Sequence, residues 1–432
     1  MIQPTKELRT THFFFQQKRW WKVVVFLSFF AFFVPTTTLQ AQPRAVKKEI
    51  QNARDNVKKN KNLEQAETAM KKLIADSAYH NNLKIWNIMA EAVKKQYEQG
   101  NEKLYLKQQY DTAKLFNLAK RMFTVYEGLD SIDALPNNDG ETKPQHRKRN
   151  ADMLLKYRPN LFNGGMYFIH KQKFADAYNL FDMYLDCTRQ PLFSHLKIDE
   201  KDQRLPEAAY WAVYCGYKMK DAKATLHHAY TALKDTAHFC LMLQYLAETY
   251  KIENDSARYV ETLQEGFNKY PRFAYFFERL AAHHAENKQW QKLVELSDNA
   301  LATDSTNTAA QLTKSTALLN LGQYNACASL CNSILVKNDS LPEALLNAGL
   351  AHFRQAVETD RSTQRMTAKR KQKITKQYQS ALPYLTKYRA LRPNDDELWG
   401  LPLYMIYLNL NMGNEFDEID KILREKQHRQ KS

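Results

Sequence analysis

Gly164 and Gly165 stand side by side in 161–186, a stretch whose other residues are typical of a helix. Each glycine inside a helix costs roughly 1 kcal/mol relative to alanine, so the pair calls for a physical reason. A phosphate-binding loop uses glycines, but such a loop follows a strand and leads into the N-terminus of a helix. These glycines lie within an amphipathic helical pattern, which predicts that their missing Cβ atoms let two helices pack closely.

Two pairs of adjacent histidines, His227–His228 and His283–His284, are the candidates for a metal site. Neighbouring residues on a helix point about 100° apart, so neither pair is predicted to chelate an ion. Cys327 and Cys331 are spaced four apart and share one helix face. A disulfide between them is one interpretation in an oxidising compartment, and small core residues are the interpretation that we prefer. The sequence therefore predicts no metal and no cofactor.

No constellation of catalytic residues is recognisable along the chain. The motifs of serine hydrolases, zinc proteases, phosphate-binding loops and dinucleotide-binding folds are all missing from the sequence. An active site assembled from distant residues would leave no such motif. An accessory enzyme that acts on cell-wall glycans therefore stays open as the weakest of three hypotheses. The leading expectation is a protein that binds a partner and is not an enzyme.

The elements that must position these residues are helices. The 432 residues include only 11 Gly and 13 Pro, and long stretches are rich in Ala, Leu, Lys, Gln and Glu. No run of alternating β-branched residues suggests a strand. This composition predicts an all-α protein.

The first 41 residues have the order of a secretory signal peptide. Basic residues at 18, 19 and 22 precede the apolar run 23–34, and small or polar residues then lead to Ala41. A bilayer crossing needs about 20 apolar residues, more than this run supplies, and a retained membrane anchor is the alternative. We expect cleavage between Ala41 and Gln42 and an exported protein, periplasmic or secreted in a Gram-negative bacterium.

Small residues recur along the second half of the chain at a fixed period. Ala247, Ala281, Ser315 and Gly349 are separated by steps of 34. With the series at 161–181 they resemble the tetratricopeptide-repeat (TPR) family, whose 34-residue unit is a pair of helices. The resemblance implies an α-solenoid, a superhelix of roughly nine antiparallel helix pairs. In the first strong copy it is carried by Leu161, Gly164, Gly165, Phe168, Phe174, Ala177 and Phe181.

The repeats and their interruptions divide the rest of the chain. An N-terminal helical region with degenerate repeats covers 42–127. The polar stretch 128–150 contains Pro and Gly and predicts an exposed loop. The TPR-like solenoid fills 151–425, with a basic helical insertion at about 355–376, and the basic tail 426–432 is expected to fray.

The insertion carries a run of basic residues with no acid among them between 361 and 377. Such a run either contacts an anionic surface or covers a solvated helical hairpin, and both interpretations stay open. We call this set the basic cluster. Its members are Arg361, Arg365, Lys369, Arg370, Lys371, Lys373 and Lys376.

The first helices of successive repeats in a solenoid line a concave face that commonly holds a partner. Tyr210, Tyr214 and Tyr217 form one helical stripe, which either anchors a partner or is buried against a neighbouring repeat. The residues that the resemblance places on this face are Phe162, Met166, His170, Tyr210, Tyr214, Tyr217, Lys218, Leu350, Phe353 and Arg354.

The leading hypothesis is an exported scaffold or adaptor that binds a protein or peptide partner along its concave face. The formal net charge of +16 would steer acidic partners, and export argues against nucleic acid. The alternative is a cell-envelope binder whose basic cluster contacts anionic lipid or polysaccharide. Repeat folds host many functions, so the sequence names no particular partner.

Overall fold

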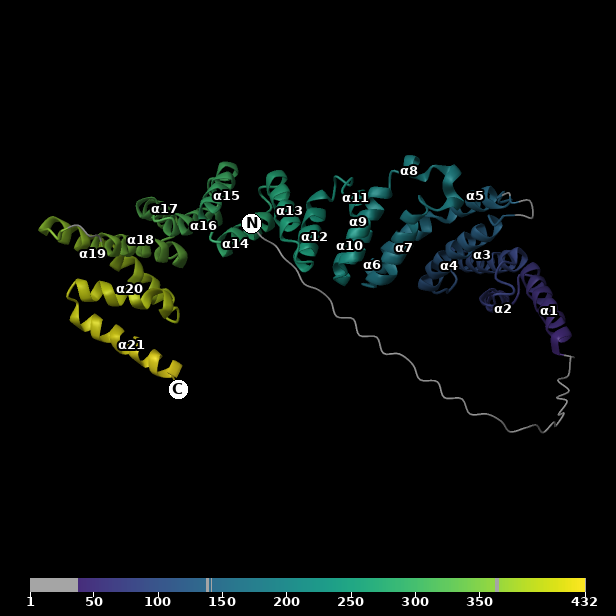
Figure 1. The fold of residues 1–432 in the computed structure, drawn as a ribbon, viewed down its shortest axis with the longest axis horizontal. Coiled ribbons are helices and arrows are strands. Elements are labelled where there is room, and N and C mark those ends of the chain that lie inside the picture. Colours follow the sequence, from purple (N-terminus) through teal and green to yellow (C-terminus); the bar gives the residue numbers. More distant parts are fainter. Residues whose placement is uncertain (1–37, 137–139, 141, 362–364, 432) are drawn as a thin grey trace, which may run out of the picture.

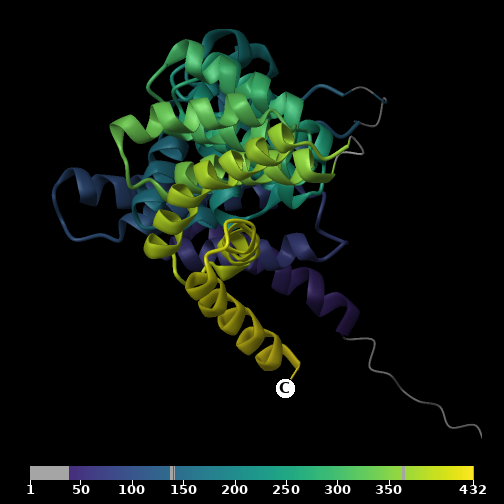
Figure 2. The same cartoon turned by 90° about the vertical axis from the view of Figure 1, so that its left-hand side faces the viewer.

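The computed structural model describes residues 38–136, 140, 142–361 and 365–431. Within these residues every regular element is helical, which confirms the all-α prediction. The helices follow one another in a long superhelical arc that starts at α1, and α20 and α21 extend beneath α18 and α19 (Figure 1). In the end-on view the successive pairs overlap into one coil, from which α21 projects (Figure 2).

Consecutive helices of the described chain form nine packed pairs, as the TPR-like pattern predicts. They are α1/α2, α3/α4, α6/α7, α9 with α10 and α11, α12/α13, α14/α15, α16/α17, α18/α19 and α20/α21. The bounds are α1 Thr38–Lys58, α2 Leu63–Ala75, α3 Leu83–Tyr105, α4 Thr112–Asp133, α5 Arg147–Tyr157, α6 Pro159–His170, α7 Phe174–Asp186, η1 Pro191–Leu196, α8 Ile198–Lys201, α9 Leu205–Met219, α10 Ala222–His227, α11 Ala229–Ala232, α12 Phe239–Ile252, α13 Ser256–Lys269, α14 Ala274–Glu286, α15 Trp290–Thr303, α16 Thr308–Asn320, α17 Tyr324–Lys337, α18 Pro342–Arg361, α19 Ala368–Leu391, α20 Asp396–Asn409 and α21 Gly413–Lys431.

The period of 34 reappears in the backbone as one repeated turn between the helices of a pair. Lys220, Asn254, Lys288 and Gly322 follow each other at that spacing, and each has a left-handed backbone with φ between 54° and 74°. After each of them, the next N–H donates to the carbonyl five residues back, which closes a Schellman motif. The repeat is therefore set locally, by a helix stop that recurs at a fixed interval.

The paired glycines are explained by packing. A Cβ atom on Gly164 would lie 2.8 Å from the ring of Phe116 in α4, and one on Gly165 would lie 2.5 Å from the ring of Phe181 in α7. Both distances are shorter than carbon atoms tolerate, so the neighbouring helices approach α6 only because the side chains are missing. The interpretation of the pair as a close helix contact is confirmed.

The predicted loop at 128–150 is shorter than expected. α4 continues to Asp133, because Leu129 and Asp130 are buried and Gly128 lets the ring of Trp86 pack against its backbone. α5 starts at Arg147, whose guanidinium forms a bidentate pair with Asp130. Polar residues at both edges of the loop thus belong to helices that they hold together.

The predicted frayed tail at 426–432 is largely helical instead. α21 runs to Lys431. The Lys426 ammonium lies 2.9 Å from Asp396 and 3.2 Å from Glu397 at the start of α20. These contacts join α21 to α20.

Cys327 and Cys331 are buried free thiols of α17, in the core that this helix forms with α16 and α18, in agreement with their interpretation as core residues. The hydrogen bond with Cys331, together with burial, raises the pKa of the Cys327 thiol. The thiol also contacts the carbonyl of Asn347 in α18. Both side chains are therefore used in packing this part of the solenoid.

Residues 1–37 of the predicted signal peptide lie outside the described chain. α1 begins at Thr38, so the expected cleavage point between Ala41 and Gln42 falls in the first turns of this helix. Among the helices that the structure describes, none has the length and apolar content of a membrane crossing.

Candidate partner-binding surfaces

The predicted tyrosine stripe of α9 is packed against α12, the first helix of the next pair. Tyr210 is 3% exposed and its ring stacks on His238 at 4.0 Å between centroids. Tyr217 stacks on Tyr245 of α12 at 4.5 Å, and Tyr214 also contacts that ring. The prediction of Tyr210 as a surface anchor is therefore wrong, and the alternative of a stripe buried against a neighbouring repeat describes this contact.

Parts of this aromatic contact still reach the surface. Tyr214 and Tyr217 are half-buried. Lys218 is exposed, with its ammonium 5.4 Å from the centre of the Tyr214 ring. A partner would meet only the edges of these rings.

The residues predicted on α6 separate into buried and accessible positions. Phe162 is 4% exposed, packs its ring on Phe181 and is covered by the guanidinium of Arg204, so its prediction as a surface residue is wrong. α6 is enclosed by α4, α5 and α7, which buries Phe162 as well as the residue before it. Met166 is half-buried against the core, and His170 is exposed at the end of the helix.

The three residues predicted on α18 are all half-buried. Leu350 packs beside the core that contains Cys327, and Phe353 lies 6.2 Å from the ring of Tyr378 in α19. Arg354 is likewise half-buried. These side chains contribute to helix packing first and offer a partner only their outer parts.

The basic cluster lies where α18 ends and α19 begins. Arg361 and Lys371 are exposed but do not line the pocket found there. Arg370 has a structural role, because its guanidinium donates to the carbonyls of Thr359 and Asp360 at the end of α18. The pocket brings together the other predicted basic residues, and its lining is Thr359, Arg365, Thr367, Lys369, Arg370, Gln372, Lys373 and Lys376.

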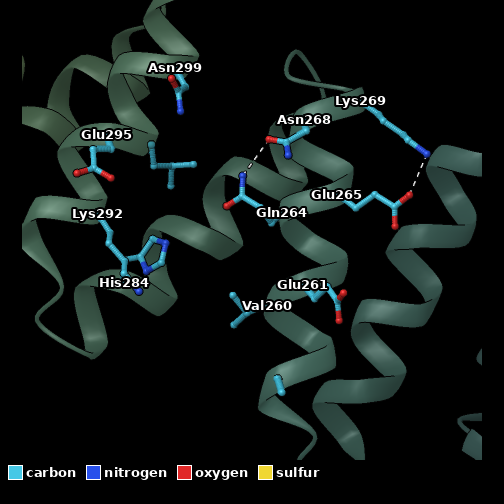
Figure 3. A pocket seen from close by; sticks show the side chains of 12 residues that line it. Val260, Glu261, Gln264, Glu265, Asn268, Lys269, His284, Lys292, Glu295 and Asn299 are labelled. Atoms are coloured by element: carbon cyan, nitrogen blue, oxygen red, sulfur yellow. Dashed lines mark hydrogen bonds and ion pairs between the residues drawn. The ribbon is translucent and has the colours of Figure 1, made fainter.

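A polar groove separates α13 from α15, with His284 of α14 between them (Figure 3). Two pairs of its side chains on α13 bond to each other. The amide of Gln264 donates to Asn268 at 2.9 Å, and the Lys269 ammonium lies 2.9 Å from Glu265. Both walls carry carboxylates and an ammonium group, so the groove has no single charge to select a ligand.

The apolar surface that the sequence analysis missed is on α20. Leu398, Leu401 and Leu408 are 46%, 60% and 54% exposed, and Met405 between them is half-buried. The four follow each other at i, i+3, i+7 and i+10 and therefore share one helix face. We call them the α20 stripe.

The opposite face of α20 is fully occupied. Trp399, Leu403 and Ile406 are at most 2% exposed and pack in the core formed with α18, α19 and α21. A helix that is apolar on nearly all sides is normally enclosed by neighbours. Within the part of the chain that the structure describes, α18, α19 and α21 pack on the face of Trp399, Leu403 and Ile406. A row of exposed apolar side chains on a soluble protein is typical of an interaction site.

No protein-family model and no curated protein matches this chain. Among solved structures, the C-terminal part of a TPR repeat-containing protein from Cytophaga hutchinsonii is similar at 10% identity, covering 60% of this chain and 93% of that one, with a TM-score of 0.41. A TPR repeats protein from Bacteroides fragilis is similar at 19% identity over 61% and 98% of the two chains, with a TM-score of 0.31. The helical-repeat fold is established by the structure itself, and no function is taken from these likenesses.

Proposed function

We propose that this protein is an exported, non-enzymatic scaffold that binds an amphipathic helix of a protein partner along the α20 stripe. The observation that carries the proposal is the row of half-exposed leucines on a helix whose other face is in the core. α20 is the first helix of its pair, the kind of helix that lines the concave face of a solenoid. The type of partner is the one predicted from the sequence, but the proposed contact is on α20 instead of on α6, α9 and α18.

The spacing of the α20 stripe favours a helical partner. From Leu398 to Leu408 the stripe extends about 15 Å along the helix axis, since a helix rises about 1.5 Å per residue. Its 3-4-3 spacing is the spacing with which two helices interlock their side chains. A partner segment with leucines at the same spacing would cover the stripe and leave its polar face in water.

Export is the second part of the proposal. It rests on the order of basic, apolar and small residues in 1–41, which is that of a signal peptide. A scaffold carrying such a segment would act outside the cytoplasm, in the periplasm or beyond it.

The proposal is tested by capturing partners with the full chain and with the variant Leu401→Asp/Leu408→Asp. Burying a leucine contributes about 1.5–3 kcal/mol, and an aspartate buried in its place adds a desolvation cost, so we expect at least about a 100-fold loss of affinity. Val336→Asp is the matched control, because Val336 is 88% exposed and lies on α17, away from the α20 stripe. Circular dichroism confirms that each variant is folded.

Two outcomes would contradict the proposal. If the double variant captures the same protein as the wild type, the α20 stripe is not the contact. If light scattering shows that the wild type is a dimer and the double variant a monomer, the stripe binds a second copy of this chain instead of a different partner.

A second candidate function uses the basic cluster, because the structure gathers Arg365, Lys369, Lys373 and Lys376 around one pocket. Such a surface would bind anionic lipid or polysaccharide of the cell envelope. Binding of this kind weakens steeply with salt, whereas contact through leucines does not. Capture at about 150 mM salt, near physiological ionic strength, therefore separates the two candidates.

A further inference from the structure

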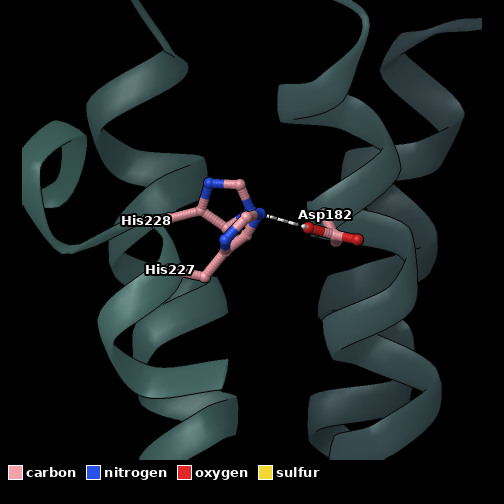
Figure 4. Close-up of side chains that lie close together, drawn as sticks. All are labelled: Asp182, His227 and His228. Carbon is pink, nitrogen blue, oxygen red and sulfur yellow. Dashed lines mark hydrogen bonds and ion pairs between the residues drawn. The ribbon is translucent and has the colours of Figure 1, made fainter. Parts of the chain in front are cut away.

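His227 and His228 meet Asp182 at the break between α10 and α11. α10 ends at His227, and His228 follows with φ −109° and ψ 10° before α11 starts at Ala229. Adjacent histidines point about 100° apart only in a continuous helix. Because the helix is broken at His228, the two side chains can point the same way. Both imidazole rings point toward Asp182 on α7 (Figure 4).

The three donor atoms lie within a few ångströms of one another. The Nε2 atom of His228 is 2.7 Å from an oxygen of Asp182, and that of His227 is 3.7 Å from the same oxygen. All three possible ligand atoms fall within 4.8 Å of each other, and no other group of this kind is found in the described part of the chain. The two rings converge on one carboxylate, so the premise that adjacent histidines point apart does not hold for this pair.

We propose that Asp182, His227 and His228 bind one divalent transition-metal ion of the zinc class. Two imidazoles and a carboxylate are ligands that zinc uses, at about 2.0–2.2 Å each. A tetrahedral ion at that distance holds its ligand atoms about 3.3–3.6 Å apart. This separation lies between the distances of 2.7 Å and 3.7 Å from the two Nε2 atoms to the Asp182 oxygen. Small rotations of the side chains would thus replace the hydrogen bond between His228 and Asp182 with two metal–ligand bonds.

Of the three proposed ligands, His228 is held by packing, whereas His227 and Asp182 are accessible to solvent. The His228 side chain is 3% exposed, so packing holds its ring in place. The side chains of His227 and Asp182 are 46% and 38% exposed, which gives an ion access from solvent and leaves a fourth position for water. Three protein ligands with one open position form a site that can also accept a ligand from a second molecule. The exposed Arg189, a cation acting on Asp182, opposes the ion's charge and limits the affinity.

A bound ion would join two parts of the solenoid. Asp182 belongs to α7. His227 is the last residue of α10, and His228 lies at the break before α11. The ion would therefore link one helix pair to the next across this break, in addition to the packing of α7 on α9.

The test is calorimetric titration of the metal-free full chain with ZnCl₂. We expect one ion per chain, and at least about a 10-fold loss of affinity in His227→Ala and in Asp182→Asn, since each removes one of three ligands. His227 is the ligand of choice for substitution because it is half-exposed and not needed for packing. MgCl₂ should not bind with comparable affinity, because imidazole ligands favour zinc over magnesium.

His283→Ala is the matched control, because His283 belongs to the other adjacent pair, which is not part of a three-ligand group. The Co²⁺-loaded protein provides an independent readout, since its visible absorption reports the coordination of the ion. The proposal is overturned if the wild type binds no Zn²⁺. It is also overturned if His227→Ala binds as tightly as the wild type, or if His283→Ala loses the ion equally.

Discussion

Replacing Asp202 with alanine is expected to lower the free energy of unfolding around α6–α9 by about 3–5 kcal/mol, the usual cost of breaking a buried ion pair. The Arg158 side chain is 5% exposed, and its Nη1 donates to Asp202 at 2.5 Å. The Nε and Nη2 atoms of Arg158 donate to the backbone carbonyl of Tyr184. The Tyr184 hydroxyl donates to Asp202 as well. Without Asp202, a guanidinium would stay buried with no carboxylate to balance it.

Hydrogen exchange of the α6–α9 amides is the measurement for Asp202→Ala, because repeat proteins unfold in segments. Glu200→Ala is the control, since the pair of Glu200 with Lys197 is exposed and should contribute less than about 1 kcal/mol. The variant Arg158→Met/Asp202→Ala should recover part of the loss, because it no longer buries a charge. A cost below about 1 kcal/mol for Asp202→Ala would show that solvent reaches the guanidinium easily.

Glu127→Gln is expected to stabilise the protein at pH 8 by up to about 3 kcal/mol, since one pKa unit corresponds to about 1.36 kcal/mol. Burial and the nearby carboxylate of Asp186 raise the pKa of Glu127 from 4.5 to about 7. The folded chain therefore binds this proton more tightly than the unfolded chain. The contribution to stability is complete below pH 4.5 and is lost as the pH rises through 7.

The measurement is the difference in unfolding free energy between the wild type and Glu127→Gln across pH 4.5–8. Glutamine stays neutral throughout, so the difference should grow with pH up to about pH 8 and then level off. Glu253→Gln is the control, because Glu253 is exposed at the end of α12. A difference that does not change with pH would mean that Glu127 ionises in the folded protein as easily as in water.

Features that are local and repeated along the chain were predictable from the sequence. The left-handed turns at Lys220, Asn254, Lys288 and Gly322 recur at the 34-residue period, and each forms within one helix end. Features that depend on a distant neighbour were not predictable in the same way. α4 extends past Gly128 because Trp86 packs there, and α21 continues beyond 426 because Lys426 reaches α20.

In the candidate sites, too, local patterns were predictable and contacts with distant residues were not. Periodicity places Tyr210 and Phe162 on a helix face, but it does not say whether neighbouring helices cover that face. The segment that leads into the next pair covers Tyr210, whereas α7 of the same pair covers Phe162. The α20 stripe could have been found from the sequence, because residues 398–408 are apolar almost without interruption. A helix with a single buried face needs apolar residues only on that face. The group at Asp182 needed a broken helix at His228, and no sequence pattern marks that break.

The most direct test of the proposed function is photo-crosslinking in cells that produce the full chain. A benzophenone amino acid replaces Leu401 in one variant and Val336 in the other, so both probes are on exposed apolar positions. We predict that the probe at 401 forms a covalent adduct with one protein partner, within a segment that has leucines at helical spacing, and that the probe at 336 forms none. Equal adducts at both positions, or none at 401, would contradict the proposal that the α20 stripe holds the partner.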